Sequence, residues 1–149
     1  MPPKETTQQQ LDRFLDAFTP PIAALARQVL HQMRRRYPTA YELAYDNYNA
    51  LAIGFAPAAR TSDAIFSIAL YPRWVSLFFL QAKQTIPDPH GLLKGSGTRV
   101  RHVVLDNPRV LQLMNQAIQL ARVPFDPHAT PELIIKSVSA KQRPRRPAR

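Results

Sequence analysis

The stretch GLLKGSGTRVRHVVL, residues 91–105, holds the residue types best suited to chemistry, because it places three of the chain's four glycines beside several cations. A phosphate-binding P-loop needs four residues between its glycines and then Gly-Lys-Ser/Thr before a helix. Here three residues separate Gly91 from Gly95, and Gly97 leads into Thr-Arg and a strand-like run. A dinucleotide-binding loop needs a third glycine where Val100 stands. Both nucleotide motifs fail, and we expect a turn in which Gly97 takes a positive φ before a strand.

The same stretch leaves a second interpretation open, in which backbone amides and neighbouring cations hold an anion. Candidate contacts for such an anion come from the cations of this stretch and from arginines near the C-terminus. The candidate anion or nucleic-acid contacts are Lys94, Arg99, Arg101, Arg143, Arg145 and Arg146.

The remaining polar side chains form no recognised catalytic or metal-binding motif. A catalytic role would need His90 and His102 to converge in a pocket, with Asp88 beside the first. Neither histidine has a second ligand at the spacing of a metal site, and the absence of cysteine excludes thiolate nucleophiles and zinc–thiolate sites. Ser96 lacks the first glycine of Gly-x-Ser-x-Gly, since Lys94 stands there. We therefore predict no catalytic residue, cofactor or metal ligand, and we expect a binding or accessory module rather than an enzyme.

Positive charge is concentrated at the C-terminal end of the sequence. The formal net charge is +10, and six of the twenty Lys and Arg residues follow Glu132, the last acidic residue. We expect residues 136–149 to form a basic, disordered tail that could hold nucleic acid or another anion by charge. Residues 1–135 are predicted to form a single domain, with its core at about residues 20–122.

Length and composition favour a small folded protein. At 149 residues and 45% hydrophobic residues, the chain can bury a core of its own. The opening MPPKETTQQQLDR lacks the apolar segment of a signal peptide, and no apolar run approaches the length of a membrane span. We expect a cytoplasmic protein with no membrane contact.

Two helices are indicated near the N-terminus by apolar residues at helical spacing. The first is short and includes Leu11, Phe14, Leu15 and Phe18. The second begins at Thr19-Pro20 and ends before Pro38, because a hydroxyl cap and then proline favour a helix start. Its apolar stripe consists of Ile22, Leu25, Ala26, Val29, Leu30 and Met33. The stretch TAYELAYDNY could begin as a further helical turn, which would place Tyr37, Tyr41, Tyr45 and Tyr48 on one face.

Strand-like segments follow, and a third helix comes after them. The expected strands are residues 49–56, 64–71, 74–80, 98–105 and 132–138, and the helix is 106–123. Pro72-Arg73 is short enough to close a hairpin. The strands are apolar on both faces, so one face should meet the helices and the other a loop, a protein partner or a second copy of the chain. The predicted fold is α+β, an antiparallel sheet with helices packed on one face.

Four segments resemble the bacterial YdhG-like domain family, long listed as a domain of unknown function. They are YELAYDNYNALAIGF, ALYPRWVSLFFLQ, IPDPHGLLKGSGTRVRHVVL and LIIKSVSAKQRPRR. The resemblance implies a frataxin-like two-layer sandwich, and it implies that the glycine stretch is a family turn rather than a nucleotide loop.

The resemblance also implies a possible role as an iron chaperone, since one member of the family has been described as such. Oxygen ligands for iron would have to come from a patch of Asp12, Asp16, Glu42 and Asp46. Frataxin-type binding uses acidic residues on the first helix, whereas residues 19–38 here hold four arginines and no Asp or Glu. No residue is therefore assigned as an iron ligand, and iron delivery and anion or nucleic-acid binding remain as alternatives for an uncharacterised binding module.

Overall fold

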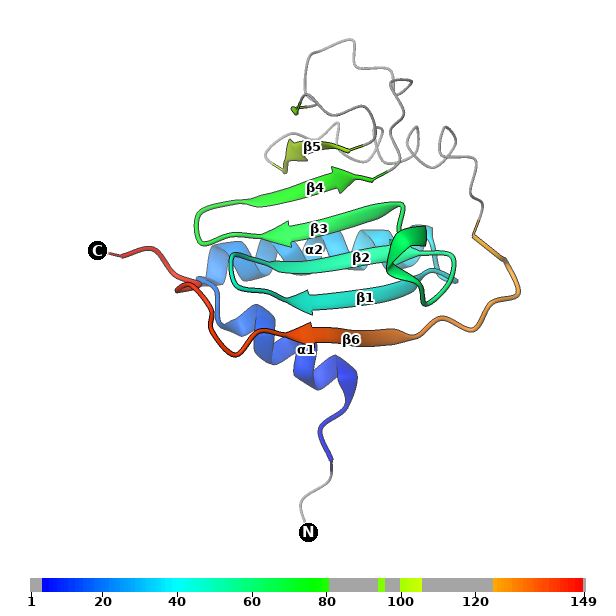
Figure 1. Ribbon diagram of the computed structural model, residues 1–149, viewed down its shortest axis with the longest axis horizontal. Helices are drawn as coiled ribbons and strands as arrows, with labels where there is room; N and C mark the ends of the chain where they lie inside the picture. The colour runs from blue at the N-terminus through cyan, green and yellow to red at the C-terminus, as the bar shows by residue number, and fades with distance from the viewer. Residues whose placement is uncertain (1–3, 81–93, 96–99, 106–124, 149) are drawn as a thin grey trace.

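The structure is a computed structural model, and it describes residues 4–80, 94–95, 100–105 and 125–148. Two helices lie behind one six-stranded sheet, whose strand order is β5-β4-β3-β2-β1-β6 (Figure 1). The elements are α1 (Thr7–Asp16), α2 (Pro20–Arg36), β1 (Tyr41–Asp46), β2 (Leu51–Ala56), a 3₁₀ turn η1 (Thr61–Asp63), β3 (Phe66–Leu70), β4 (Val75–Phe79), β5 (Arg101–Val104) and β6 (Leu133–Val138). The predicted α+β class is confirmed. Neither helix has the length and apolar character of a membrane span, within the part of the chain that the structure describes.

Both N-terminal helices form where the sequence predicts them, and local signals explain their bounds. At the start of α1, the Thr6 hydroxyl accepts a bond from the Gln9 amide at 3.0 Å, and the Gln9 side chain accepts one from the Thr6 amide at 2.9 Å. This reciprocal pair satisfies two backbone donors that a helix start leaves free. The helix α2 has Pro20 at its first position and ends at Arg36, just before Pro38. Its buried face is Ala23, Ala26, Val29, Leu30 and Met33.

The sheet is mixed, because its sixth strand runs parallel to its neighbour. Each of the pairs β1–β2, β2–β3, β3–β4 and β4–β5 is antiparallel, whereas β6 pairs with β1 in parallel. The possible helical turn at TAYELAYDNY is not formed, since Tyr41–Asp46 is the strand β1. Pairing with β2 on one side and β6 on the other stabilises this strand over any local helical preference.

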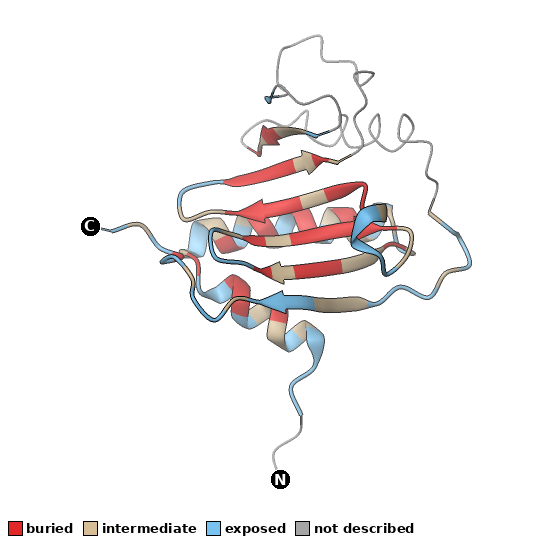
Figure 2. Ribbon diagram, in the orientation of Figure 1, coloured by how far each residue is buried: buried red, intermediate tan, exposed pale blue. Residues whose placement is uncertain are grey.

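The two faces of the sheet differ in the size of their side chains. Across the strands, Ile53, Ile68 and Leu77 are register partners and are fully buried in the core that the helices cover (Figure 2). On the opposite face, at the neighbouring positions, Ala52 pairs with Ala69 and Ala69 pairs with Ser76, so small side chains lie side by side on β2, β3 and β4. The helices α1 and α2 lie on the other side of the sheet (Figure 1), so neither helix covers these small residues.

The structure describes most of the residues for which we predicted a basic, disordered tail, up to residue 148. Residues 136–138 belong to β6, and residues 139–148, here called the C-terminal arm, fold back onto the β1–β2 turn. The physical reason is the burial of one arginine of the arm, Arg145, which is 8% exposed. A charge count cannot foresee that one of these cations has a buried partner.

Several predictions fall on residues outside the described ranges. These are the helix at 106–123, the positive φ of Gly97, the contact of Arg99 with an anion and the approach of His90 to His102. Within the described part of the glycine stretch, Gly95 has a φ of 106° and β5 follows at Arg101.

Candidate functional site

A buried ion pair fixes the C-terminal arm to the end of β1. The Nη2 atom of Arg145 donates to Asp46 Oδ1 at 2.9 Å, and the two side chains are 6% and 9% exposed. The same guanidinium donates to the carbonyls of Asn47 and Tyr48 and lies 5.6 Å from the centre of the Phe18 ring. The charge of Arg145 is therefore neutralised inside the protein, and this residue is not available for an external anion.

Backbone bonds on both sides of Arg145 hold the arm along the β1–β2 turn. The Ser139 amide donates to the Asp46 carbonyl at 2.8 Å, and the Arg143 amide donates to the Tyr48 carbonyl at 2.9 Å. The Gln142 side chain adds a bond to the Asp46 carbonyl at 2.9 Å. These contacts make the arm a part of the fold that can position side chains.

The anchored arm presents two exposed arginines next to the β3–β4 hairpin. Arg143 lies over the Tyr48 ring at 5.9 Å. Arg146 donates to the carbonyls of Ala17 and Asp16 at 3.2 and 3.4 Å, where the C-terminus of α1 leaves carbonyls without helical partners. Neither arginine pairs with a carboxylate in the part of the chain that the structure describes.

The arm and the hairpin together border an open cavity of about 600 Å³, here called the arginine cleft. It is lined by Asn49, Tyr71, Pro72, Arg73, Trp74, Arg143, Pro144, Arg146, Pro147 and Ala148. Among the described residues, this lining includes three arginines and no acidic side chain. Since like charges meet here without a carboxylate, the cleft has a positive potential that favours an anion.

Two aromatic rings form one wall of the arginine cleft. The tight turn at Pro72-Arg73 is closed by a bond of 2.9 Å from the Tyr71 amide to the Trp74 carbonyl, which brings the flanking rings together. Their centres are 4.8 Å apart with an angle of 20° between the planes. Trp74 remains 43% exposed, so a large flat surface lies beside the arginines.

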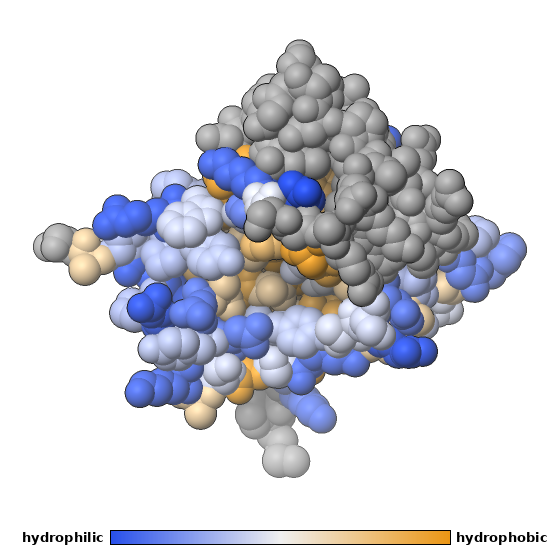
Figure 3. All heavy atoms as spheres, turned by 45° about the horizontal axis from the view of Figure 1, so that its top comes forward, coloured by the Kyte–Doolittle hydropathy of each residue, from blue (hydrophilic) through white to orange (hydrophobic). Residues whose placement is uncertain are grey.

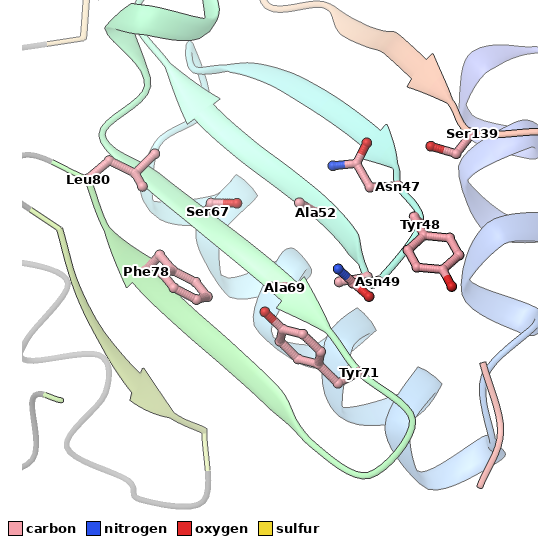
Figure 4. A pocket seen from close by; sticks show the side chains of 11 residues that line it. Asn47, Tyr48, Asn49, Ala52, Ser67, Ala69, Tyr71, Phe78, Leu80 and Ser139 are labelled. Atoms are coloured by element: carbon pink, nitrogen blue, oxygen red, sulfur yellow. The ribbon is translucent and has the colours of Figure 1, made fainter. Parts of the chain in front are cut away.

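A second cavity, here called the sheet groove, adjoins the first on the face opposite the helices (Figure 4). Its volume is about 570 Å³, and its lining is Asn47, Tyr48, Asn49, Ala50, Ala52, Ser67, Ala69, Tyr71, Phe78, Leu80 and Ser139. In the space-filling view an apolar area lies in the middle of this face, with hydrophilic side chains beside it (Figure 3). Among the described residues the lining contains no charged side chain, and Asn49 and Tyr71 also belong to the arginine cleft.

The predicted anion contacts are divided among three places. Arg143 and Arg146 lie in the arginine cleft, Arg145 is buried, and Arg99 lies outside the described residues. The exposed Lys94 exchanges backbone bonds with His102, and Arg101 donates to the Gly95 carbonyl at 2.6 Å. Arg101 pairs with Phe79, at the end of β4 away from the hairpin turn, so the structure does not bring the glycine stretch to the cleft.

The acidic residues considered for iron each contact a donor group. Arg34 grips Glu42 with two bonds of 2.8 Å, Arg27 donates to Asp16 at 2.7 Å, and Gln8 donates to Asp12 at 3.0 Å. Asp46 is the partner of Arg145. In the described ranges, no three His, Cys, Asp or Glu side chains gather as metal ligands would.

The sequence analysis missed the hairpin half of the cleft. The sequence predicts a turn at Pro72-Arg73, with Tyr71 and Trp74 at the ends of the flanking strands, and assigns none of the four residues to a site. Its composition is a usable signal, because an arginine between two aromatic residues in a tight turn exposes charge and flat rings together. Comparison of the chain with protein-family models, curated proteins and solved structures finds no match, so the resemblance to YdhG-like domains stays a prediction.

Proposed function

We propose that this protein is a small binding module, not an enzyme, and that it binds an anionic ligand in the arginine cleft. The observation that carries the proposal is the lining itself, in which Arg73, Arg143 and Arg146 meet with no acidic side chain among the described residues. Guanidinium groups offer planar pairs of donors that match phosphate and carboxylate groups. The other lining groups are two aromatic rings, three prolines, an amide and Ala148, which can bind and orient a ligand. We also propose, on the sequence motifs, a YdhG-like domain located in the cytoplasm.

The anchored arm supports this proposal because it sets the cation positions before any ligand arrives. Arg145 holds the backbone on which Arg143 and Arg146 stand, while the hairpin turn holds Arg73. A site that is already ordered loses less conformational entropy on binding than a free tail does. The ligand is therefore expected to bind the folded protein rather than to order a flexible tail.

Calorimetric titration with inorganic tripolyphosphate tests the proposal. The wild-type protein should show saturable binding that weakens as salt is added, since the attraction is electrostatic. Arg73→Ala/Arg143→Ala should weaken binding at least about tenfold, because two charge-assisted contacts are lost. The matched control is Arg35→Ala/Lys136→Ala, which removes two exposed cations outside the cleft and should bind as the wild type does. Absence of binding, or equal weakening in both variants, would contradict the proposed site.

A further inference from the structure

The two cavities differ in the charge of their linings, and they are adjacent because two residues line both of them. In the part of the chain that the structure describes, the arginine cleft has three cationic side chains in its lining, whereas the sheet groove has no charged side chain of either sign. Asn49 and Tyr71 line both. A ligand that fills the whole surface must therefore combine an anionic part with an adjoining uncharged part.

The sheet groove has the chemistry to receive a flat, polar-edged group. Ala52, Ser67 and Ala69 are small, so the sheet itself forms the floor, and the Phe78 ring stands at one side (Figure 4). The opposite end carries amides and a hydroxyl, which donate and accept hydrogen bonds; these are Asn47, Asn49 and Ser139. The groove is shallow and open to solvent, so a flat group can lie on the sheet in it.

The exposed ring of Trp74 provides a second place for a flat group. Stacking on Tyr71 fixes its orientation, and 43% of the residue remains exposed next to Arg73. Aromatic side chains in a cationic groove are the arrangement with which proteins hold unpaired bases, since every base has a face that can stack.

We infer that the anionic ligand is a single-stranded nucleic acid, an inference that rests on the proposed function. Its phosphates lie on the three arginines of the cleft, one base stacks on Trp74, and a neighbouring base enters the sheet groove. A polyphosphate or an acidic peptide fills only the charged half of the surface. A duplex keeps its base faces inside the stack and cannot reach the groove or Trp74.

Fluorescence anisotropy of a labelled oligouridine measures the affinity of the full-length protein for a single strand directly. Competitors are the unlabelled strand, the same strand annealed to its complement, uridine monophosphate, and tripolyphosphate. We expect the single strand to compete at least about tenfold better than the duplex, because stacking needs free bases. The mononucleotide should compete more weakly than the strand, since it fills one part of the surface. Equal competition by strand and duplex, or by strand and mononucleotide, would overturn the inference.

Substitution of the stacking ring separates this inference from the proposed function. Trp74→Ala should weaken the oligonucleotide at least about fivefold and leave tripolyphosphate binding unchanged, because stacking contributes only where a base is present. Trp74→Phe keeps a flat ring and should restore most of the affinity. If tripolyphosphate binds in the cleft and Trp74→Ala leaves oligonucleotide affinity unchanged, the anion site stands and the nucleic-acid inference fails. If neither ligand binds, both fail.

Discussion

Arg145 and Asp46, ninety-nine residues apart in the sequence, form an ion pair of 2.9 Å in which each side chain is at least nine-tenths buried. The pair connects the C-terminal arm to the end of β1 and the turn that follows it. A charge at this depth is tolerated only with its partner, because removal from water is costly for an unpaired ion. The arm is therefore expected to contribute to folding as well as to the arginine cleft.

Removal of the arginine from this pair should destabilise the protein strongly. Arg145→Met leaves the Asp46 carboxylate buried without its cation, and the free energy of unfolding should fall by about 3 kcal/mol. Urea denaturation measures the change. The double variant Asp46→Asn/Arg145→Met should recover part of the loss, because it leaves no unpaired charge. A urea midpoint for Arg145→Met equal to that of the wild type would contradict a stabilising role of the ion pair.

Truncation of the arm should also lower stability. Deletion of residues 140–149 removes Gln142, Arg145 and Arg146 with their bonds to Asp46, Tyr48, Ala17 and neighbouring carbonyls. The loss should be at least as large as that of Arg145→Met, about 3 kcal/mol. Thermal unfolding followed by circular dichroism gives the comparison. A midpoint equal to that of the full chain would mean that the arm is a dispensable tail.

Gly95 should resist replacement, whereas Gly54 should accept it. Gly95 has a φ of 106°, which an L side chain adopts only with strain, so Gly95→Ala should cost about 1 kcal/mol or more. A Cβ at Gly54 would meet its nearest neighbours at 3.7 Å, an ordinary contact, and its φ lies outside the left-handed region. Gly54→Ala is therefore the matched control, with a stability close to that of the wild type. Equal unfolding free energies for the two variants would contradict the assigned backbone conformation.

Tyr37 should make the protein sensitive to alkaline pH. Burial raises the pKa of its hydroxyl, while the nearby Arg36 acts in the opposite direction. Because the folded-state pKa is the higher one, the stability contribution is complete below the unfolded pKa of about 10 and is lost as pH rises through the folded pKa. Tyr37→Phe keeps the ring that stacks on Phe66 at 5.7 Å and removes the titrating group. Unfolding free energies measured against pH should therefore fall less steeply above pH 10 in Tyr37→Phe, and parallel curves would contradict the role of burial.

Local patterns were enough to predict the helices and the central hairpin. The helix α2 follows from its apolar spacing and its Thr19-Pro20 start, and the β3–β4 hairpin follows from two apolar runs around Pro72-Arg73. Both depend on neighbours within a few residues. The strand β1 was less clear, because part of its stabilisation comes from β6, about ninety residues later in the chain, in addition to the nearby β2.

The candidate site was only half predictable for the same reason. Arg143 and Arg146 were expected to contact an anion because the C-terminus is rich in arginine. Their position beside Trp74 depends on the buried bond between Arg145 and Asp46, and no local pattern reveals a bond between residues so distant in sequence. Nothing in the sequence around Asp46 distinguishes this buried aspartate from an exposed one.

Trp74 offers the most direct measurement of ligand binding in the cleft, because it is the chain's single tryptophan and lines the cavity. Its emission, and the quenching of that emission by acrylamide, should be followed while oligouridine is added to the wild-type protein. The account predicts a saturable change in emission and a loss of acrylamide quenching, with the midpoint that anisotropy gives, because a bound base covers the exposed ring. Oligonucleotide binding that leaves both the emission and the quenching of Trp74 unchanged would place the ligand elsewhere and contradict the account.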